Sequence, residues 1–147
     1  MADIHWHDML EYQQLLAQFA RGMLSHSQKQ FLTASERELL AWIFLSPEKC
    51  TPLSLSKQSG MKKEAVSRLL KQLVDKGCIT KQKMPGDARS YSLSLTATGE
   101  SSLDKDCMMI LGPFYTLYRE MGADFTKLFD LLGEANKILS KEEPDSK

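Results

Sequence analysis

The stretch that most constrains the fold runs from residue 51 to residue 95. Within it, residues 63–76 carry apolar side chains at helical spacing on one face and long polar side chains on the other. The apolar positions are Val66, Leu69, Leu70, Leu73 and Val74; the polar ones are Lys63, Glu64, Ser67, Arg68, Lys71 and Gln72. One face of this predicted helix can dock on a core, which leaves the other free to contact phosphates and base edges.

The start of this helix is unusual in its charge. Lys62 and Lys63 stand where a capping Ser, Asp or Asn would be expected, and both add positive charge to the positive end of the helix dipole. Glu64 offsets part of that charge. A phosphate placed between the lysines and the free backbone N–H groups would make the arrangement favourable. The alternative is that both lysines are simply solvated.

A short helix precedes the long one. Thr51 can cap it, Pro52 suits its first position, and Leu53 and Leu55 are expected to point inward. Gly60 ends this helix and opens a three-residue turn, a length that holds two such helices at a steep angle.

A hairpin is predicted after the long helix. Gly77 ends the helix, residues 78–84 form a strand, and Pro-Gly-Asp at 85–87 turns the chain. Apolar residues at 91, 93 and 95 then alternate with serines in a half-buried return strand. Lys81 and Lys83 flank the hairpin. The order of elements indicates a helix-turn-helix followed by a wing.

These residues resemble the MarR family of winged-helix transcription regulators over nearly the whole chain. The most specific parts of the likeness are Asp-x-Arg at 87–89 and Leu-Thr-x-x-Gly at 95–99. The resemblance implies a homodimer that binds pseudo-palindromic double-stranded DNA. It further implies that helix 63–76 lies in the major groove and that Arg89, oriented by Asp87, enters the minor groove.

The predicted DNA contacts come from both helices and from the wing, residues 84–91. They are Ser54, Lys62, Lys63, Glu64, Ser67, Arg68, Lys71, Lys81, Asp87 and Arg89. The chain departs from the family pattern at Lys62, which replaces a capping residue, and at Ser59, where an apolar residue is common. Both departures predict a looser turn than in typical members.

The charge distribution supports a DNA-binding face on residues 52–90. The chain of 147 residues has no net charge, yet residues 52–90 hold nine basic and three acidic side chains, a net charge of +6. Residues 1–51 have a net charge of −2 and residues 91–147 one of −4. A basic patch on an acidic body is the electrostatic footprint of a DNA-binding face.

Amphipathic helices are predicted on both sides of the winged domain. One spans 8–24, a capping box at 33–36 starts another over 36–45, and a helix capped by Thr96 must break at Gly112-Pro113 before a last helix over 124–140. The outer helices carry more apolar surface than one such domain buries, which predicts a dimer interface. Its predicted residues are Leu15, Leu16, Phe19, Phe125, Leu128, Phe129, Leu132 and Leu139.

The expected fold is therefore mainly α with a small β-hairpin wing. Residues 1–30 form an N-terminal dimerisation helix, 31–96 the winged helix-turn-helix domain, 97–141 the C-terminal dimerisation helices and 142–147 a polar tail. In the resembled family, the crevice beside the dimer region often takes a small molecule. A set of aromatic and sulfur-containing residues would suit it, although core or interface packing is the commoner role: Trp6, Trp42, Met108, Met109, Phe114, Tyr115 and Tyr118.

Other site classes have little support in the sequence. His5 and His7 lie beside acidic residues, but chance proximity explains them better than a zinc site, so neither metal nor cofactor is expected. Of three cysteines, Cys78 and Cys107 are expected to be buried and Cys50 to lie in a loop, without a disulfide framework. No catalytic motif, signal peptide or membrane span is visible, which favours a non-enzyme in a reducing cytoplasm.

The sequence thus predicts a dimeric, sequence-specific DNA-binding regulator, a repressor that a small-molecule effector would release. Two alternatives stay open. One is a winged-helix module that binds a protein partner, and the other is a ligand-sensing dimer without DNA binding. The positive charge on residues 52–90 counts against the first, and measured DNA affinity would decide the second.

Overall fold

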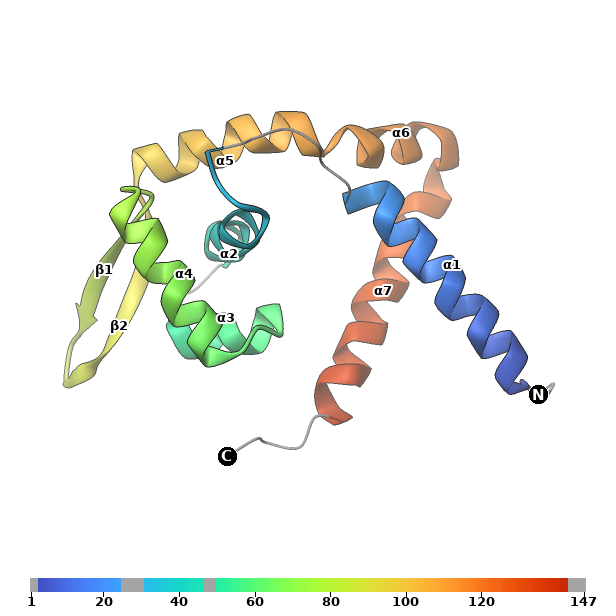
Figure 1. The fold of residues 1–147 in the computed structure, drawn as a ribbon, viewed down its shortest axis with the longest axis horizontal. Coiled ribbons are helices and arrows are strands. Elements are labelled where there is room, and N and C mark those ends of the chain that lie inside the picture. Colours follow the sequence, from blue (N-terminus) through green and yellow to red (C-terminus); the bar gives the residue numbers. More distant parts are fainter. Residues whose placement is uncertain (1–2, 25–30, 47–49, 143–147) are drawn as a thin grey trace. The chain divides into compact units, whose positions relative to one another are not determined.

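The computed structural model describes residues 3–24, 31–46 and 50–142, apart from the side chains of 87–90 and 142. Over these ranges the chain is mainly helical with one two-stranded antiparallel sheet, as the sequence predicts (Figure 1). It divides into two compact units, residues 27–109 and residues 1–26 with 110–147. In chain order the elements are α1 Trp6–Leu24, α2 Ala34–Leu45, α3 Pro52–Ser59, α4 Lys63–Asp75, β1 Ile79–Met84, β2 Asp87–Leu95, α5 Ala97–Ile110, α6 Gly112–Met121 and α7 Ala123–Glu142.

The unit of residues 27–109 has a closed apolar core, to which α2, α3, α4, the hairpin and α5 all contribute. Its most deeply buried side chains are Leu32, Leu39, Leu40, Leu55, Val66, Leu70, Leu73 and Cys78. The predicted capping box starts α2: the Glu36 amide donates to Thr33 Oγ1 at 3.2 Å, and the Thr33 amide donates to Glu36 Oε2 at 3.1 Å. Each side chain thus satisfies an amide that the helix leaves unpaired.

The helix-turn-helix forms where the sequence predicts it. Thr51 caps α3, Pro52 takes its first turn, and Gly60 ends it with a φ of 73°, a left-handed value that favours glycine. α4 begins after Lys62, which makes no side-chain capping hydrogen bond.

Two expected core residues are exposed instead. Leu53 has an exposed fraction of 52%, because residues two positions apart on a helix point in nearly opposite directions and Leu55 takes the inward one. Val74 is 38% exposed, since it lies about 90° around α4 from the centre of the stripe formed by Val66, Leu69, Leu70 and Leu73. The buried arc of α4 is therefore narrower than predicted.

The wing is the antiparallel pair β1 and β2, with Ile79 opposite Leu95 and Lys83 opposite Tyr91. The register then shifts, so that Met84 faces Asp87 across a turn in which Gly86 has a φ of 86°. Ser92 is buried, contrary to the expected outward serines. β2 also contacts the chain before α3, where the Leu93 amide donates to the Cys50 carbonyl at 2.8 Å.

The start of α5 explains the Leu-Thr-x-x-Gly pattern. The Thr96 hydroxyl oxygen accepts a hydrogen bond from the Gly99 amide at 3.0 Å and so caps the helix. A Cβ added to Gly99 would overlap with the Cys78 carbonyl oxygen. Only glycine lets the first turn of α5 approach the backbone that follows α4 this closely.

The second unit contains α1, α6 and α7, and α6 contacts both of the others. The helix break at Gly112-Pro113 occurs as predicted, and Gly122 ends α6. Phe125 lies at the centre of an aromatic cluster, with ring centroids 5.6 Å from Tyr118 and 4.8 Å from Phe129. Among its described residues only Met23 is a buried apolar side chain. No helix in the described ranges is long and apolar enough to cross a membrane.

Candidate nucleic-acid interface

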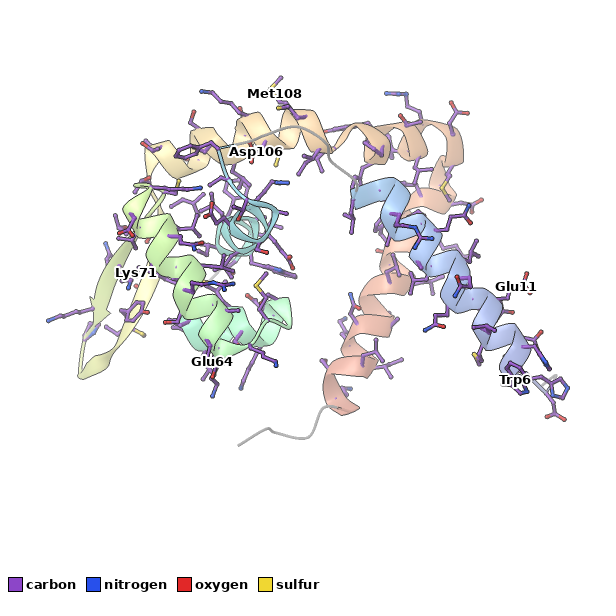
Figure 2. The ribbon with its side chains drawn as sticks, viewed as in Figure 1. Trp6, Glu11, Glu64, Lys71, Asp106 and Met108 are labelled. Carbon is purple, nitrogen blue, oxygen red and sulfur yellow. The ribbon has the colours of Figure 1, made fainter. Side chains whose placement is uncertain are left out.

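The outward face of α4 is the largest continuous part of the candidate site. Lys63, Glu64, Ser67, Arg68 and Lys71 are all exposed, while the apolar stripe behind them is buried. Figure 2 places Glu64 in the first turn of α4 and Lys71 farther along the same helix. The folded helix thus presents donors and one carboxylate to solvent along about two turns.

The start of α4 is open to an anion. Lys62 has extended backbone angles (φ −65°, ψ 149°) and supplies no side-chain cap, so the amides of the first turn have no side-chain acceptor from that residue. Lys62 and Lys63 are both exposed beside these amides. Backbone N–H groups, the helix dipole and two ammonium groups all favour negative charge at this point.

Ser54 has a structural role that the sequence interpretation missed. Its hydroxyl oxygen accepts from the Thr51 amide at 2.9 Å and its hydroxyl donates to the Thr51 carbonyl at 2.9 Å. The Thr51 side chain in turn accepts from the Ser54 amide at 3.1 Å. Thr-x-x-Ser is thus a second capping box, and the contact of Ser54 with DNA stays a prediction.

On the wing, Lys81 is held by an aromatic ring. Its Nζ lies 4.8 Å from the centroid of the Tyr91 ring, a cation–π geometry between residues diagonally placed on the two strands. Lys81 and Lys83 are exposed. Asp87 and Arg89 lie in β2, but their side chains are outside the part of the chain that the structure describes.

A buried charged group behind α4 was not anticipated. Lys76 Nζ lies 2.6 Å from Glu36 Oε2 and 2.6 Å from the Phe31 carbonyl oxygen. Arg37 and Asp106 are also buried in this unit, with exposed fractions of 7% and 5%. Lys76 is separated from Glu36 by 40 positions, so no local pattern signals the pair.

Asp106 belongs to α5 (Figure 2), and its Oδ2 has no hydrogen-bond partner among the described residues. Burial raises the pKa of this carboxyl, while the positive charges of Arg37 and Lys76 act against the rise.

The predicted dimer residues all lie in the unit of α1, α6 and α7. Leu15, Leu16 and Leu139 have exposed fractions of 62%, 58% and 61% within one chain. The others are half-buried: Phe19, Phe125, Leu128, Phe129 and Leu132.

The residues suggested for an effector pocket are divided between the two units. Trp42, Met108 and Met109 lie in the unit of residues 27–109, with Met108 81% exposed, and the remaining four lie in the other unit. A hollow of about 390 Å³ runs along α7 and includes none of them. Because one helix supplies its whole lining, this hollow is an open face rather than an enclosed pocket.

The cysteines differ partly from expectation. Cys78 is buried as predicted, and Cys50 lies in the segment between α2 and α3, also as predicted, where it is 3% exposed and forms an isolated bridge with Leu93. Cys107 is half-buried. Desolvation raises the pKa of Cys78 and Cys107 and so disfavours their reactive thiolate forms. The described residues contain no cluster of three or more His, Cys, Asp or Glu able to hold a metal ion.

Comparisons with known proteins agree with this geometry. The model of the MarR family matches residues 32–91. A MarR/EmrR family transcriptional regulator from Acinetobacter is similar at a TM-score of 0.69 with 21% identity, over 95% of this chain and 99% of that one. A mutant MarR from Escherichia coli, solved in complex with operator DNA, gives a TM-score of 0.65 with 20% identity, over 90% of this chain and 98% of that one.

A third solved relative is NadR in complex with 4-hydroxyphenylacetate. Its TM-score is 0.67 at 20% identity, and the match covers 97% of this chain and 96% of that one. No curated protein gives a significant match. At these identities, the solved structures show the fold, and the family model matches residues 32–91, the part of the chain from α2 into β2.

Proposed function

We propose that this chain is a member of the MarR family and a dimeric, sequence-specific DNA-binding transcriptional regulator. The single observation that carries the proposal is the division of α4 into a fully buried apolar stripe and an exposed polar face. A helix of this kind fits the major groove, whose base edges offer distinct patterns of donors and acceptors.

Different residues have different tasks at the groove. Ser67 and Arg68 lie in the middle of the exposed face, where they would contact base edges. Lys62, Lys63 and Lys71 would contact phosphates, together with the uncapped amides at the start of α4. Lys81 would reach the backbone from the wing, and Arg89 would enter the adjacent minor groove.

The proposed assembly is a homodimer formed by the unit of α1, α6 and α7. In a single chain, this unit leaves large apolar side chains exposed on α1 and α7. A second copy of the chain would cover them. Two α4 helices would then enter successive major grooves about 10 base pairs apart on a pseudo-palindrome.

Control by an effector follows from this arrangement. A dimer satisfies both half-sites only at one separation of its two α4 helices, so a ligand that favours another separation releases the DNA. The solved complex of NadR with 4-hydroxyphenylacetate supports a small aromatic acid as the kind of effector to test first. We propose that the protein acts as a repressor in the cytoplasm and has no enzymatic activity.

The test is the dependence of DNA binding on salt. Four lysines per protomer, Lys62, Lys63, Lys71 and Lys81, would give a dimer eight phosphate contacts. The logarithm of the association constant should then fall against the logarithm of salt concentration with a slope of about −7. A slope near zero, or no binding to duplex DNA at low salt, would instead support an adaptor or a sensor without DNA binding.

A further inference from the structure

The two ends of α4 are held in different ways. At its start, Lys62 provides no side-chain cap and the first residues are exposed. At its end, the Cys78 amide donates to the Leu73 carbonyl at 2.9 Å, and the Gly77 amide donates to the Val74 carbonyl at 2.9 Å. With Gly77 at a φ of 74°, these bonds close the last turn in a Schellman motif.

The side chain of Lys76 fixes this end further. Its ammonium donates to Glu36 Oε2 and to the Phe31 carbonyl, each at 2.6 Å, and lies 5.1 Å from the centroid of the Phe31 ring. The Glu36 side chain is only 3% exposed and that of Lys76 29%. Charge-assisted hydrogen bonds this short, one of them to a buried carboxylate, restrict a side chain that usually moves freely in water.

Glu36 joins this contact to the start of another helix. The same Oε2 atom that accepts from Lys76 also accepts from the Thr33 amide at 3.1 Å, where it completes the capping box of α2. One carboxylate oxygen therefore links the first turn of α2 to the residue that ends α4.

A second connection comes from α5. The Thr96 amide donates to the Cys78 carbonyl at 3.0 Å, the Thr96 hydroxyl donates to the Gly77 carbonyl at 2.5 Å, and Gly99 lies against the same backbone. Residues 76–78 are thus held from the α2 side and from the α5 side, which makes the end of α4 a fixed pivot.

We propose that Lys76 and Glu36 are positioning residues for DNA reading, which hold this pivot so that the exposed face of α4 meets base edges at one angle. The inference rests on the proposed function. Ser67 lies nine residues from Lys76, about 13 Å along the helix, so a tilt of about 10° at the pivot would move it by about 2 Å. Hydrogen bonds to bases tolerate a few tenths of an ångström, whereas flexible lysines can follow a phosphate.

The experiment separates positioning from simple stabilisation with three variants. Glu36→Gln keeps a side chain that can complete the capping box but removes the charge that faces Lys76. Lys76→Met leaves a buried carboxylate without its ammonium partner, and the double variant Glu36→Gln/Lys76→Met removes both charges. The matched control is Glu134→Gln, which breaks the exposed ion pair with Lys137 on α7.

For each folded variant, dissociation constants are measured at several salt concentrations for two duplexes. The specific duplex is the one that the parent protein selects from a random DNA pool, and the other is a scrambled version of it. We expect the preference for the specific duplex to fall about tenfold in Glu36→Gln and in the double variant, with the salt slope unchanged. Lys76→Met should lose the most thermal stability. The double variant should regain thermal stability but not the preference for the specific duplex. Glu134→Gln should match the parent protein in both properties.

Two outcomes overturn the inference, and they are distinguishable. If the parent prefers its duplex and the double variant keeps that preference, the ion pair is only structural and the positioning role is wrong. If the parent itself shows no preference, the proposed function fails first and the positioning role falls with it.

Discussion

Asp106 is a buried carboxyl whose surroundings make its charge costly. Burial raises its pKa above the ordinary value of an aspartate, and Arg37 on α2 and Lys76 after α4 only partly oppose the rise. A raised folded pKa means that this group stabilises the fold most below the pKa of an unfolded aspartate. That contribution is lost as pH rises through the folded pKa.

Replacing Asp106 with Asn should therefore raise the free energy of unfolding at pH 7 by about 1 kcal/mol, because the buried group is then neutral. The gain should shrink as pH falls through the raised pKa of the parent carboxyl, because the parent group then becomes neutral as well. Urea unfolding at several pH values measures the difference. Asp104→Asn, an exposed change on the same helix, should show neither effect. A gain that does not depend on pH would contradict the assignment.

Gly99 allows a second test at the scale of one residue. Gly99→Ala should lower the free energy of unfolding by about 1–3 kcal/mol, since the new methyl group overlaps with the Cys78 carbonyl and one backbone must move. Gly133→Ala is the matched control, because its methyl meets nothing within 4 Å in the same chain. Thermal unfolding compares the two variants. Equal changes in stability would contradict the close approach of Gly99 to the Cys78 backbone.

At the scale of elements, the sequence is most informative where a local rule acts. The caps at Thr33 and Thr51, the glycine at the end of α3 and the break at Gly112-Pro113 all rest on contacts within one or two turns, and all were predictable. The burial of Leu53 and Val74 was mispredicted because it depends on which arc of each helix the core covers. The Lys76–Glu36 pair and the Lys81–Tyr91 contact connect different elements, so periodicity alone could not indicate them.

α4 itself yields a prediction that divides base contacts from phosphate contacts. Arg68→Ala should cost about 1–3 kcal/mol of binding free energy and relax the preference at one position of the site. Lys71→Ala should weaken binding to all sequences alike and reduce the salt slope by about 1 for each phosphate that the variant no longer neutralises. Competition binding against single-base variants measures both. If Arg68→Ala discriminates among sequences as the parent does, its assignment to a base edge is wrong.

At the scale of the whole molecule, the unit of α1, α6 and α7 buries little of its apolar surface in a single chain: among its described residues, Met23 alone is a buried apolar side chain. Leu139→Asp places a charge on its exposed apolar surface and should shift the protein from dimer to monomer. Leu45→Asp is the control, because Leu45 is about as exposed as Leu139, at 68% against 61%, but lies in the unit of residues 27–109. Sedimentation at several concentrations gives the masses. If Leu45→Asp is monomeric and Leu139→Asp stays dimeric, the interface lies in the unit of residues 27–109 and the proposed assembly is wrong.

We propose that two copies of this chain read a pseudo-palindrome through α4. Selection of bound duplexes from a random DNA pool, with the full chain at two salt concentrations, tests this proposal. We predict recovery of a pseudo-palindrome with half-sites about 10 base pairs apart, bound less tightly at the higher salt. Weak binding without sequence preference at either salt concentration would show that α4 does not read a DNA sequence.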